Sequence, residues 1–223
     1  SALAEDMVFQ KITLNRGTQL FQNAKYEEAS HYFKKASLQT FDNTVKSKAL
    51  YWLAESHYRL QKYAQALVFF KRFYKSKEAE KTKVYENIEY AIAYCYFKIQ
   101  DYERSIIHFE NFINTKSVNA VKKNDSYVRL GDCQFISKNY WKALTSYQKV
   151  VENKGIDADY ATYQKAISYG FVERDQRKIE SLISFSKTHA ESSYKDDALF
   201  ELGNAYLKTK QNLKALRAFQ ELV

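Results

Sequence analysis

The residues that could do chemistry in this sequence are few and lie far apart. The chain has four histidines, which are His31, His57, His108 and His189. None shares a short motif with Cys, Asp or Glu at the spacing of metal ligands, and the five glycines form no phosphate-binding loop. Catalysis requires a nucleophile, a base and an orienting group that converge, and the sequence offers no such set. We therefore predict a protein that is not an enzyme and needs no cofactor or metal.

The composition indicates a folded, helical chain. Its 45% apolar and 16% aromatic residues exceed what disordered segments carry. Proline is absent and glycine is scarce, so the residues that punctuate all-β folds are missing. No apolar run approaches the roughly 20 residues of a membrane-spanning helix. The net charge of +9 could attract nucleic acid, but a lysine-rich solvated surface is the simpler interpretation.

A repeated pattern decides the fold. In each unit a small residue is followed 12 positions later by a second one, and an aromatic ring comes four residues after that. The small pairs are Gly17 and Ala29, Ala54 and Ala66, Ala93 and Ser105, Gly131 and Ala143, and Gly203 and Ala215. The rings are Phe33, Phe70, Phe109, Tyr147 and Phe219. Two helices approach to the short end of about 8–10 Å only where the contacting side chains are small. The pattern therefore predicts tight helical hairpins.

One unit departs from this pattern. In residues 160–189, Ile167 and Ile179 occupy the small positions and Ile183 the aromatic one. The turns of four other units carry a tyrosine, namely Tyr26, Tyr63, Tyr102 and Tyr140. Successive units are spaced by 37, 39, 38, 36 and 36 residues, and extra residues fall at 77–82 and 114–119. The expected units are 10–40, 47–77, 86–115, 124–153, 160–189 and 196–223.

The pattern resembles the tetratricopeptide repeat (TPR), most closely at Leu202-Gly203-Asn204-Ala205-Tyr206 with Ala215 and Phe219. The resemblance covers essentially the whole chain. It implies an all-α fold, a right-handed α-solenoid of six hairpins and about 12 helices, as one domain over residues 1–223. The terminal Pro of the repeat is missing, so residues 42–44 and 191–193 are expected to supply helix N-caps. The long repeats resemble bacterial cell-envelope members, which slightly favours the periplasmic side of the envelope over the cytoplasm.

The repeat also predicts structural roles for the residues with reactive side chains. His57 stands where the family usually has Tyr, so we expect a partly buried, hydrogen-bonded histidine. Cys95 and Cys133 occupy equivalent places in adjacent units. Equivalent places lie roughly 10 Å apart, whereas a disulfide needs Cα atoms within about 7 Å. Both cysteines are therefore expected to fill the core without a bridge.

The resemblance implies that the first helix of each hairpin lines a concave face. Positions −3, +1 and +4 from the first small residue share one side of that helix. Tyrosine is favoured at recognition surfaces because its ring buries area while its hydroxyl stays wet. We therefore predict a non-catalytic scaffold that binds an amphipathic helix or an extended peptide of another protein. The predicted partner-binding residues are Tyr51, Glu55, Tyr58, Tyr90, Tyr94, Phe97, Asp132 and Phe135. For the +4 rings, packing between consecutive units is the alternative.

Two other binding modes were weighed against a peptide groove. Family members that clamp a C-terminal carboxylate place Lys, Arg and Asn at set positions, and this chain does not match them. Binding of single-stranded RNA would suit the net charge and the aromatic residues. However, acidic residues lie along the same face, namely Glu55, Asp125, Asp132 and Asp197. RNA binding is therefore the alternative function, and nucleic acid is not the expected partner.

The last residues predict an uncovered end. Leu216, Phe219 and Val223 recur at the spacing of an apolar helix face. A solenoid needs a terminal unit with a polar outer face. We therefore expect the chain to be part of a larger protein, and we expect two copies of it to associate end to end.

Overall fold

The computed structural model describes residues 1–116 and 119–223. The chain divides into two compact units, Ser1–Val118 and Asn119–Val223. In the described residues all regular structure is helical, with twelve α-helices and two 3₁₀ turns, and no strand. The prediction of one domain over residues 1–223 stays a prediction. Of the predicted loop 114–119, residues 117–118 lie outside the described residues.

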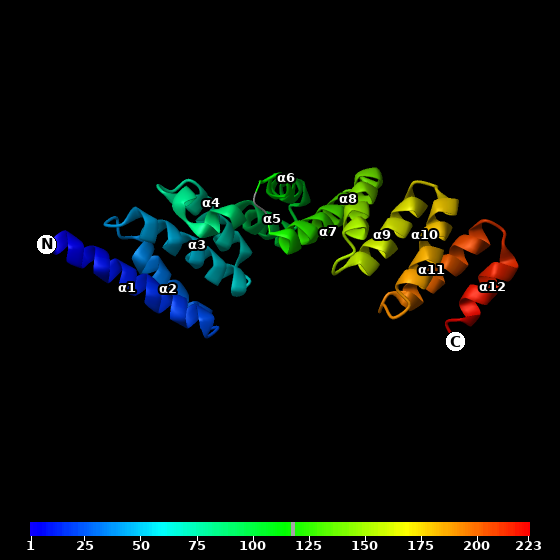
Figure 1. Cartoon of the computed structure of the whole chain (residues 1–223), viewed down its shortest axis with the longest axis horizontal. Helices are drawn as coiled ribbons and strands as arrows, with labels where there is room; N and C mark the ends of the chain where they lie inside the picture. Colours follow the sequence, from blue (N-terminus) through cyan, green and yellow to red (C-terminus); the bar gives the residue numbers. More distant parts are fainter. Residues whose placement is uncertain (117–118) are drawn as a thin grey trace. The chain divides into compact units, whose positions relative to one another are not determined.

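The first unit contains three antiparallel hairpins. Its elements are α1 (Ala2–Gln22), α2 (Tyr26–Ser37), α3 (Asn43–Arg59), α4 (Tyr63–Tyr74), η1 (Ala79–Lys81), η2 (Lys83–Asn87), α5 (Ile88–Lys98) and α6 (Tyr102–Ile113). Helices that follow one another pack side by side, so α2 lies between α1 and α3, and α3 lies between α2 and α4 (Figure 1). The predicted hairpins are therefore confirmed in this unit.

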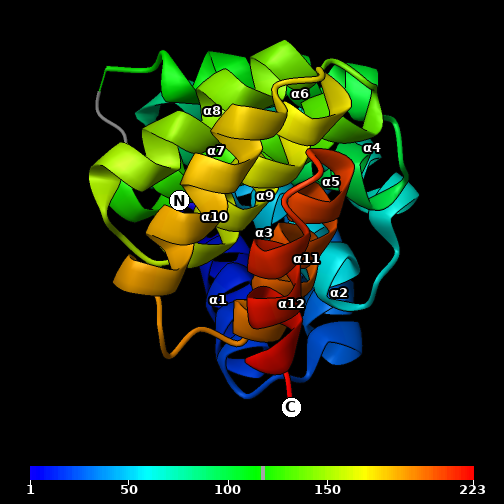
Figure 2. The same ribbon diagram turned by 90° about the vertical axis from the view of Figure 1, so that its right-hand side faces the viewer.

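The second unit repeats this arrangement. Its helices are α7 (Ala120–Ile136), α8 (Tyr140–Asn153), α9 (Ala158–Phe171), α10 (Asp175–Thr188), α11 (Lys195–Lys208) and α12 (Asn212–Gln220). Each again packs against the next, and Figure 2 shows the last pair, α11 and α12, side by side. Each helix gains a buried face only from its neighbours, which is the packing principle of a repeat protein.

The predicted contact between ring and small residue closes the hairpins. The rings of Phe33, Phe70, Phe109 and Tyr147 are all buried. A Cβ placed on Gly17 would lie 2.7 Å from the Phe33 ring, and one on Gly131 would lie 2.6 Å from the Tyr147 ring. The small residue of the first helix is therefore the surface on which the ring of the second helix rests.

Every hairpin turn has the same backbone geometry. The residue seven positions after the first small residue adopts a positive φ of 58–63°. These residues are Ala24, Gln61, Gln100, Lys138, Glu173 and Lys210. The next backbone N–H donates to the carbonyl five residues earlier, at 2.8–2.9 Å. This 6→1 bond with a left-handed residue is the Schellman way of ending a helix.

The turn corrects the predicted register of the fifth hairpin. There the left-handed residue is Glu173, and the Arg174 N–H donates to the Tyr169 carbonyl at 2.9 Å. Counting back seven positions gives Ala166, which is fully buried, and the ring position becomes Leu182, which is also fully buried. Ile167 and Ile183, which the spacing assigned to these roles, are only half-buried. The prediction was wrong by one residue, because the connection before this hairpin is one residue shorter than assumed.

Polar side chains hold the loops between hairpins. They stand seven residues before the first small residue, and they are Gln10, Ser47, Asn124 and Asp159. The Asp42 N–H donates to Gln10 Oε1 at 2.9 Å, and the Asn124 amide donates to the Ile156 carbonyl at 3.2 Å. The Ser192 hydroxyl donates to Asp159 Oδ2 at 2.6 Å. Each of these side chains therefore fastens the loop that leaves its own hairpin.

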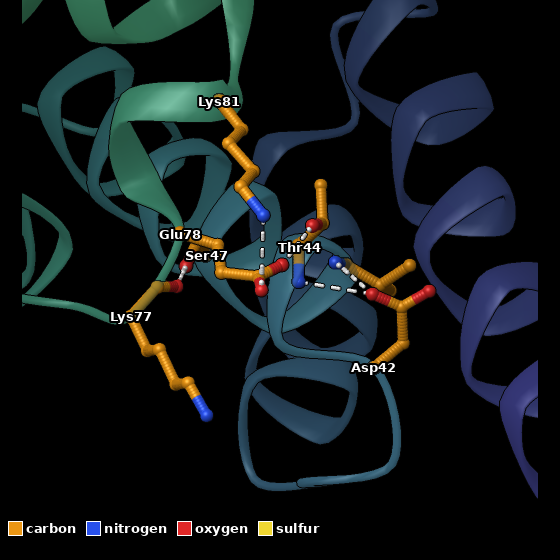
Figure 3. A network of polar contacts seen from close by, with 7 residues as sticks. Asp42, Thr44, Ser47, Lys77, Glu78 and Lys81 are labelled. Carbon is orange, nitrogen blue, oxygen red and sulfur yellow. Dashed lines mark hydrogen bonds and ion pairs between the residues drawn. The ribbon is translucent and has the colours of Figure 1, made fainter.

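The loop after α4 shows this fastening in detail (Figure 3). The Ser47 hydroxyl donates to the Lys77 carbonyl at 2.7 Å, and the Thr44 hydroxyl donates to Glu78 Oε2 at 2.8 Å. Asp42 accepts bonds from the Thr44 and Val45 N–H groups at 2.9 and 3.1 Å, which confirms the predicted N-cap of α3.

Replacing Phe70 with Ala tests the hairpin core. The ring is 1% exposed, so its removal should lower the free energy of unfolding by about 3–5 kcal/mol. Urea denaturation followed by circular dichroism measures the loss. Val68→Ala, on the same helix and 47% exposed, is the control and should change stability far less. Equal losses from both variants would show that the ring is not the core residue of the hairpin.

Replacing Ala66 with Phe tests the close approach of the helices. Ala66 is fully buried, and overpacking a tight contact costs about 1–3 kcal/mol. Thermal unfolding should show a lower midpoint than for the wild type. An unchanged midpoint would mean that α3 and α4 are not held together at this residue.

Candidate functional site

The predicted site residues lie on three first helices. Tyr51, Glu55 and Tyr58 lie on α3, and Tyr90, Tyr94 and Phe97 lie on α5, all in the first unit. Asp132 and Phe135 lie on α7 in the second unit. The two groups are therefore considered separately.

Tyr51 is a core residue, which corrects its assignment to the groove. Its side chain is 5% exposed, and its ring packs edge-on against Phe70 and Phe73, each at 5.4 Å between centroids. Burial, followed by the charge and hydrogen bond of Glu55, raises the pKa of the Tyr51 hydroxyl. The physical reason is that position −3 faces the ring of its own second helix. Leu14 and Val128 at the same position are also buried.

The other aromatic residues that were predicted as site residues in the first unit form a half-buried surface. We call Tyr58, Tyr90, Tyr94 and Phe97, with Glu55, the aromatic face. The Tyr90 and Tyr94 rings meet edge-on at 4.9 Å, and Tyr94 packs on the buried Phe109 at 5.3 Å. Burial, and then Cys95, Tyr63 and Tyr94, raise the pKa of the Tyr58 hydroxyl well above its usual value. Tyr58 of α3 packs against the core cluster that contains Cys95 and Tyr96 of α5, which joins the two helices.

The rings at position +4 also close their own turns. Each meets the turn tyrosine of its hairpin edge-on. The pairs are Phe21 and Tyr26 at 5.0 Å, Tyr58 and Tyr63 at 5.1 Å, Phe97 and Tyr102 at 5.9 Å, and Phe135 and Tyr140 at 5.2 Å. Packing between consecutive units is confirmed for two of these rings, since Phe21 meets Trp52 at 5.1 Å and Phe135 meets Phe171 at 5.4 Å.

Residues at position +5, which the sequence reasoning missed, join neighbouring hairpins. Each lies against the turn residue of the preceding hairpin. The pairs are Arg59 over the Tyr26 ring at 5.7 Å, Lys98 over Tyr63 at 5.9 Å, Phe171 stacked on Tyr140 at 4.6 Å, and Lys208 with Asp175 at 3.0 Å. Where the turn residue is an aspartate, the partner is a lysine. The sequence signal for this contact is the match of residue types between position +5 of one hairpin and position +9 of the hairpin before it.

Asp132 is part of a buried hydrogen-bonded network, and its assignment to the groove was wrong. Its side chain is 7% exposed. Oδ1 accepts the hydroxyls of Tyr147 at 2.7 Å and Tyr160 at 2.8 Å, and Oδ2 pairs with Arg129 at 2.8 Å. Burial raises the pKa of the Asp132 carboxyl, and the bonds from the two tyrosines oppose that rise. Asp132 thus joins α7, α8 and α9 and does not offer a free carboxylate.

His57 and the cysteines have structural roles. His57 is half-buried and stacks on Phe69 at 5.3 Å. Its Nδ1 has no hydrogen-bond partner in the described residues, so the expected hydrogen bond was wrong at this atom. Burial, and then Lys62, lower the pKa of His57, which favours a neutral ring. Cys95 and Cys133 are buried and unbridged, as predicted.

The described residues contain no group of three or more His, Cys, Asp or Glu that could hold a metal ion. None of their helices is both long and apolar enough to cross a membrane.

Comparison with known proteins agrees with the repeat. A family model of the tetratricopeptide repeat matches residues 14–80, and a second one matches residues 197–223. The search of curated proteins gave no match.

Among solved structures, the C-terminal part of a TPR repeat-containing protein from Cytophaga hutchinsonii is similar at a TM-score of 0.74 and 16% identity. That match covers 94% of this chain and 77% of the other. YrrB, a TPR protein with an unusual peptide-binding site, gives 0.67 and 15%, over 86% and 94% of the two chains. MamA from Desulfovibrio magneticus gives 0.63 and 18%, over 79% and 92%. These likenesses show the fold alone, and they confirm the predicted α-solenoid.

Removing one hydroxyl tests the Asp132 network. Tyr160→Phe deletes a bond that holds the pKa of Asp132 down, so that pKa should rise further. The folded carboxyl already binds its proton more tightly than the unfolded one. The free energy of unfolding should therefore fall more steeply as the pH rises from about 4. Carbon-13 NMR of the carboxyl measures the pKa, and Tyr163→Phe is the control. Equal pKa values in the two variants would contradict the network.

Proposed function

We propose that this chain, a member of the tetratricopeptide-repeat family, binds a peptide segment of another protein across the aromatic face of α3 and α5. A repeat scaffold of this family is a protein-interaction module, and the open question is which surface it uses. The absence of catalysis, the end-to-end association of two copies and a location in the bacterial cell envelope stay predictions.

One observation carries this proposal. Tyr58, Tyr90, Tyr94 and Phe97 stay half-buried on two neighbouring first helices, while the rings beneath them, such as Phe109, are fully buried. The aromatic face therefore has a rigid floor and polar hydroxyl edges. Such surfaces suit peptide recognition, because tyrosine loses little conformational entropy and combines apolar contact with hydrogen bonding.

The charge beside the aromatic face supports a peptide over nucleic acid. Glu55 lies on the same side of α3 and would repel a phosphate chain. YrrB, which has a similar fold, is a TPR protein with an unusual peptide-binding site. Peptide binding is therefore compatible with this architecture, although that protein says nothing about which residues act here.

A peptide library tests the proposal. A random 12-residue library displayed on phage should yield binders when selected on the immobilised chain. With one synthetic binder, the double variant Tyr58→Phe and Tyr94→Phe should weaken affinity by about 5- to 100-fold, since each lost hydrogen bond is worth about 0.5–1.5 kcal/mol. Fluorescence anisotropy measures the affinity. These changes remove hydroxyls only, so the core stays filled.

The matched control is Tyr127→Phe on α7, another half-buried tyrosine outside the aromatic face. It should leave the affinity unchanged, and thermal unfolding should be the same for all variants. If the double variant binds as tightly as the control, the peptide lies elsewhere. Salt-sensitive binding of a 20-nucleotide oligouridine at 50 mM salt, with no peptide selected, would favour the RNA alternative.

A further inference from the structure

A second candidate site lies in the other unit, on the fifth hairpin. A cleft with a volume of about 1050 Å³ is bounded by α9, by α10 and by the loops that precede α9 and follow α10. We call it the α9 cleft. Helices α8 and α10 both pack on α9, so α9 forms the floor between them. The cleft shares no residue with the aromatic face of the first unit.

Lys165 in this cleft breaks the repeat at a position that is buried in four other hairpins, and its own side chain is half-buried. It immediately precedes the small residue Ala166. Four other hairpins have a buried aliphatic residue there, and these are Leu53, Ile92, Leu130 and Leu202. The first hairpin has Arg16, which is exposed. Lys165 is thus a cationic side chain where the repeat places an apolar one, and such a departure costs stability.

In the described residues the charge of Lys165 makes no ion pair with Asp or Glu. Its amine donates to Gln148 Oε1 at 2.7 Å and lies over the Tyr169 ring at 5.8 Å. Burial, and then the positive charge of Arg177, lower the pKa of Lys165, and the negative charge of Glu152 opposes them. Two cations therefore face the cleft at this end, and a bound anion would relieve their repulsion.

A second lysine of the same hairpin shows what a purely structural substitution looks like. Lys178 occupies the second small position, where most hairpins have Ala or Ser. Its amine pairs with Glu201 Oε2 at 2.7 Å, and its side chain is largely covered. Lys178 thus has an ion-paired carboxylate, whereas Lys165 has only the charge of Glu152, with which it makes no ion pair.

We propose that the α9 cleft binds an acidic peptide, with one of its carboxylates held by Lys165 and Arg177. A volume near 1000 Å³ is at the upper end for ligand sites, so the cleft has room for several residues rather than a lone ion. Asp157, Asp159, Glu180 and Glu191 line the same cleft. They would repel a continuous phosphate chain, whereas a peptide can place isolated carboxylates at the cationic end.

The decisive variant is Lys165→Leu, which restores the residue type of the other hairpins. It should weaken binding of the fluorescein-labelled hexapeptide Gly-Glu-Ser-Gly-Glu-Ser, here called the diglutamate peptide, by about tenfold or more, while the thermal midpoint stays equal or rises. Lys142→Leu is the control for binding that depends on the net charge of the protein alone. Lys142 is an exposed lysine of α8 that does not line the cleft, and its loss changes the net charge equally. Lys142→Leu should bind nearly as the wild type does.

A second pair of variants protects the test against misfolding. Arg177 is exposed, so Arg177→Gln should fold and should also weaken binding of the diglutamate peptide several-fold. Lys142→Gln, at the equivalent place one hairpin earlier, should not. A hexapeptide of Gly and Ser, made with a free or an amidated C-terminus, shows whether a terminal carboxylate is sufficient or whether glutamate side chains are needed.

Three results would overturn the proposal. The first is equal binding by Lys165→Leu and Lys142→Leu. The second is no binding of any of these peptides to the wild type at 1 mM. The third is displacement of the diglutamate peptide by an oligouridine that itself loses affinity in Lys165→Leu, which would make the site one for nucleic acid. None of these depends on the hydroxyl variants of α3 and α5, so failure here and failure of the peptide groove are distinguishable.

Discussion

In five of the six hairpins a ring rests on a residue that has little or no side chain. The Cβ that Gly131 lacks would lie 2.6 Å from the Tyr147 ring, closer than packed carbon atoms approach, so the two helices meet at their smallest separation here. Ring and small residue come from different helices sixteen positions apart. The contact therefore fixes both the distance between the helices and their relative register. The burial of Tyr51, the closure of each turn and the position of the next hairpin follow from it.

This contact explains how much of the fold could be predicted from the sequence. Small and aromatic residues at constant spacing are directly readable, and five hairpins were placed from them. The fifth has Ala166 and Leu182 at these positions, with Lys178 where a small residue was sought. Isoleucines one residue later gave a competing pattern, and the register was misplaced by one. Only the left-handed turn at Glu173 settles it, and a non-glycine residue gives no sequence signal for that conformation.

The site residues were harder to predict because the same helix face both packs in the core and provides the candidate binding surface. Helical periodicity puts positions −3, +1 and +4 on one side, but it does not say how far the neighbouring hairpin covers that side. Tyr51 is buried, whereas Tyr90 at the same position is half-buried. Asp132 is drawn into the core by the hydroxyls of Tyr147 and Tyr160. Neither partner is visible to an argument that considers one helix at a time.

In a repeat protein, each position can be compared with the equivalent positions of the other hairpins. Where a polar residue recurs in place, as at Gln10, Ser47 and Asn124, its hydrogen bonds to the following loop show that the repeat requires it. Where a polar residue appears in only one hairpin, the question is whether a neighbouring side chain of opposite charge pairs with it. Lys178 has Glu201, and Asp175 has Lys208. Lys165 has an amide oxygen, the face of a ring and the charge of Glu152, with which it makes no ion pair. A half-buried charge without an ion pair destabilises the folded state, so a ligand outside the chain is the simplest reason for a lysine at this position.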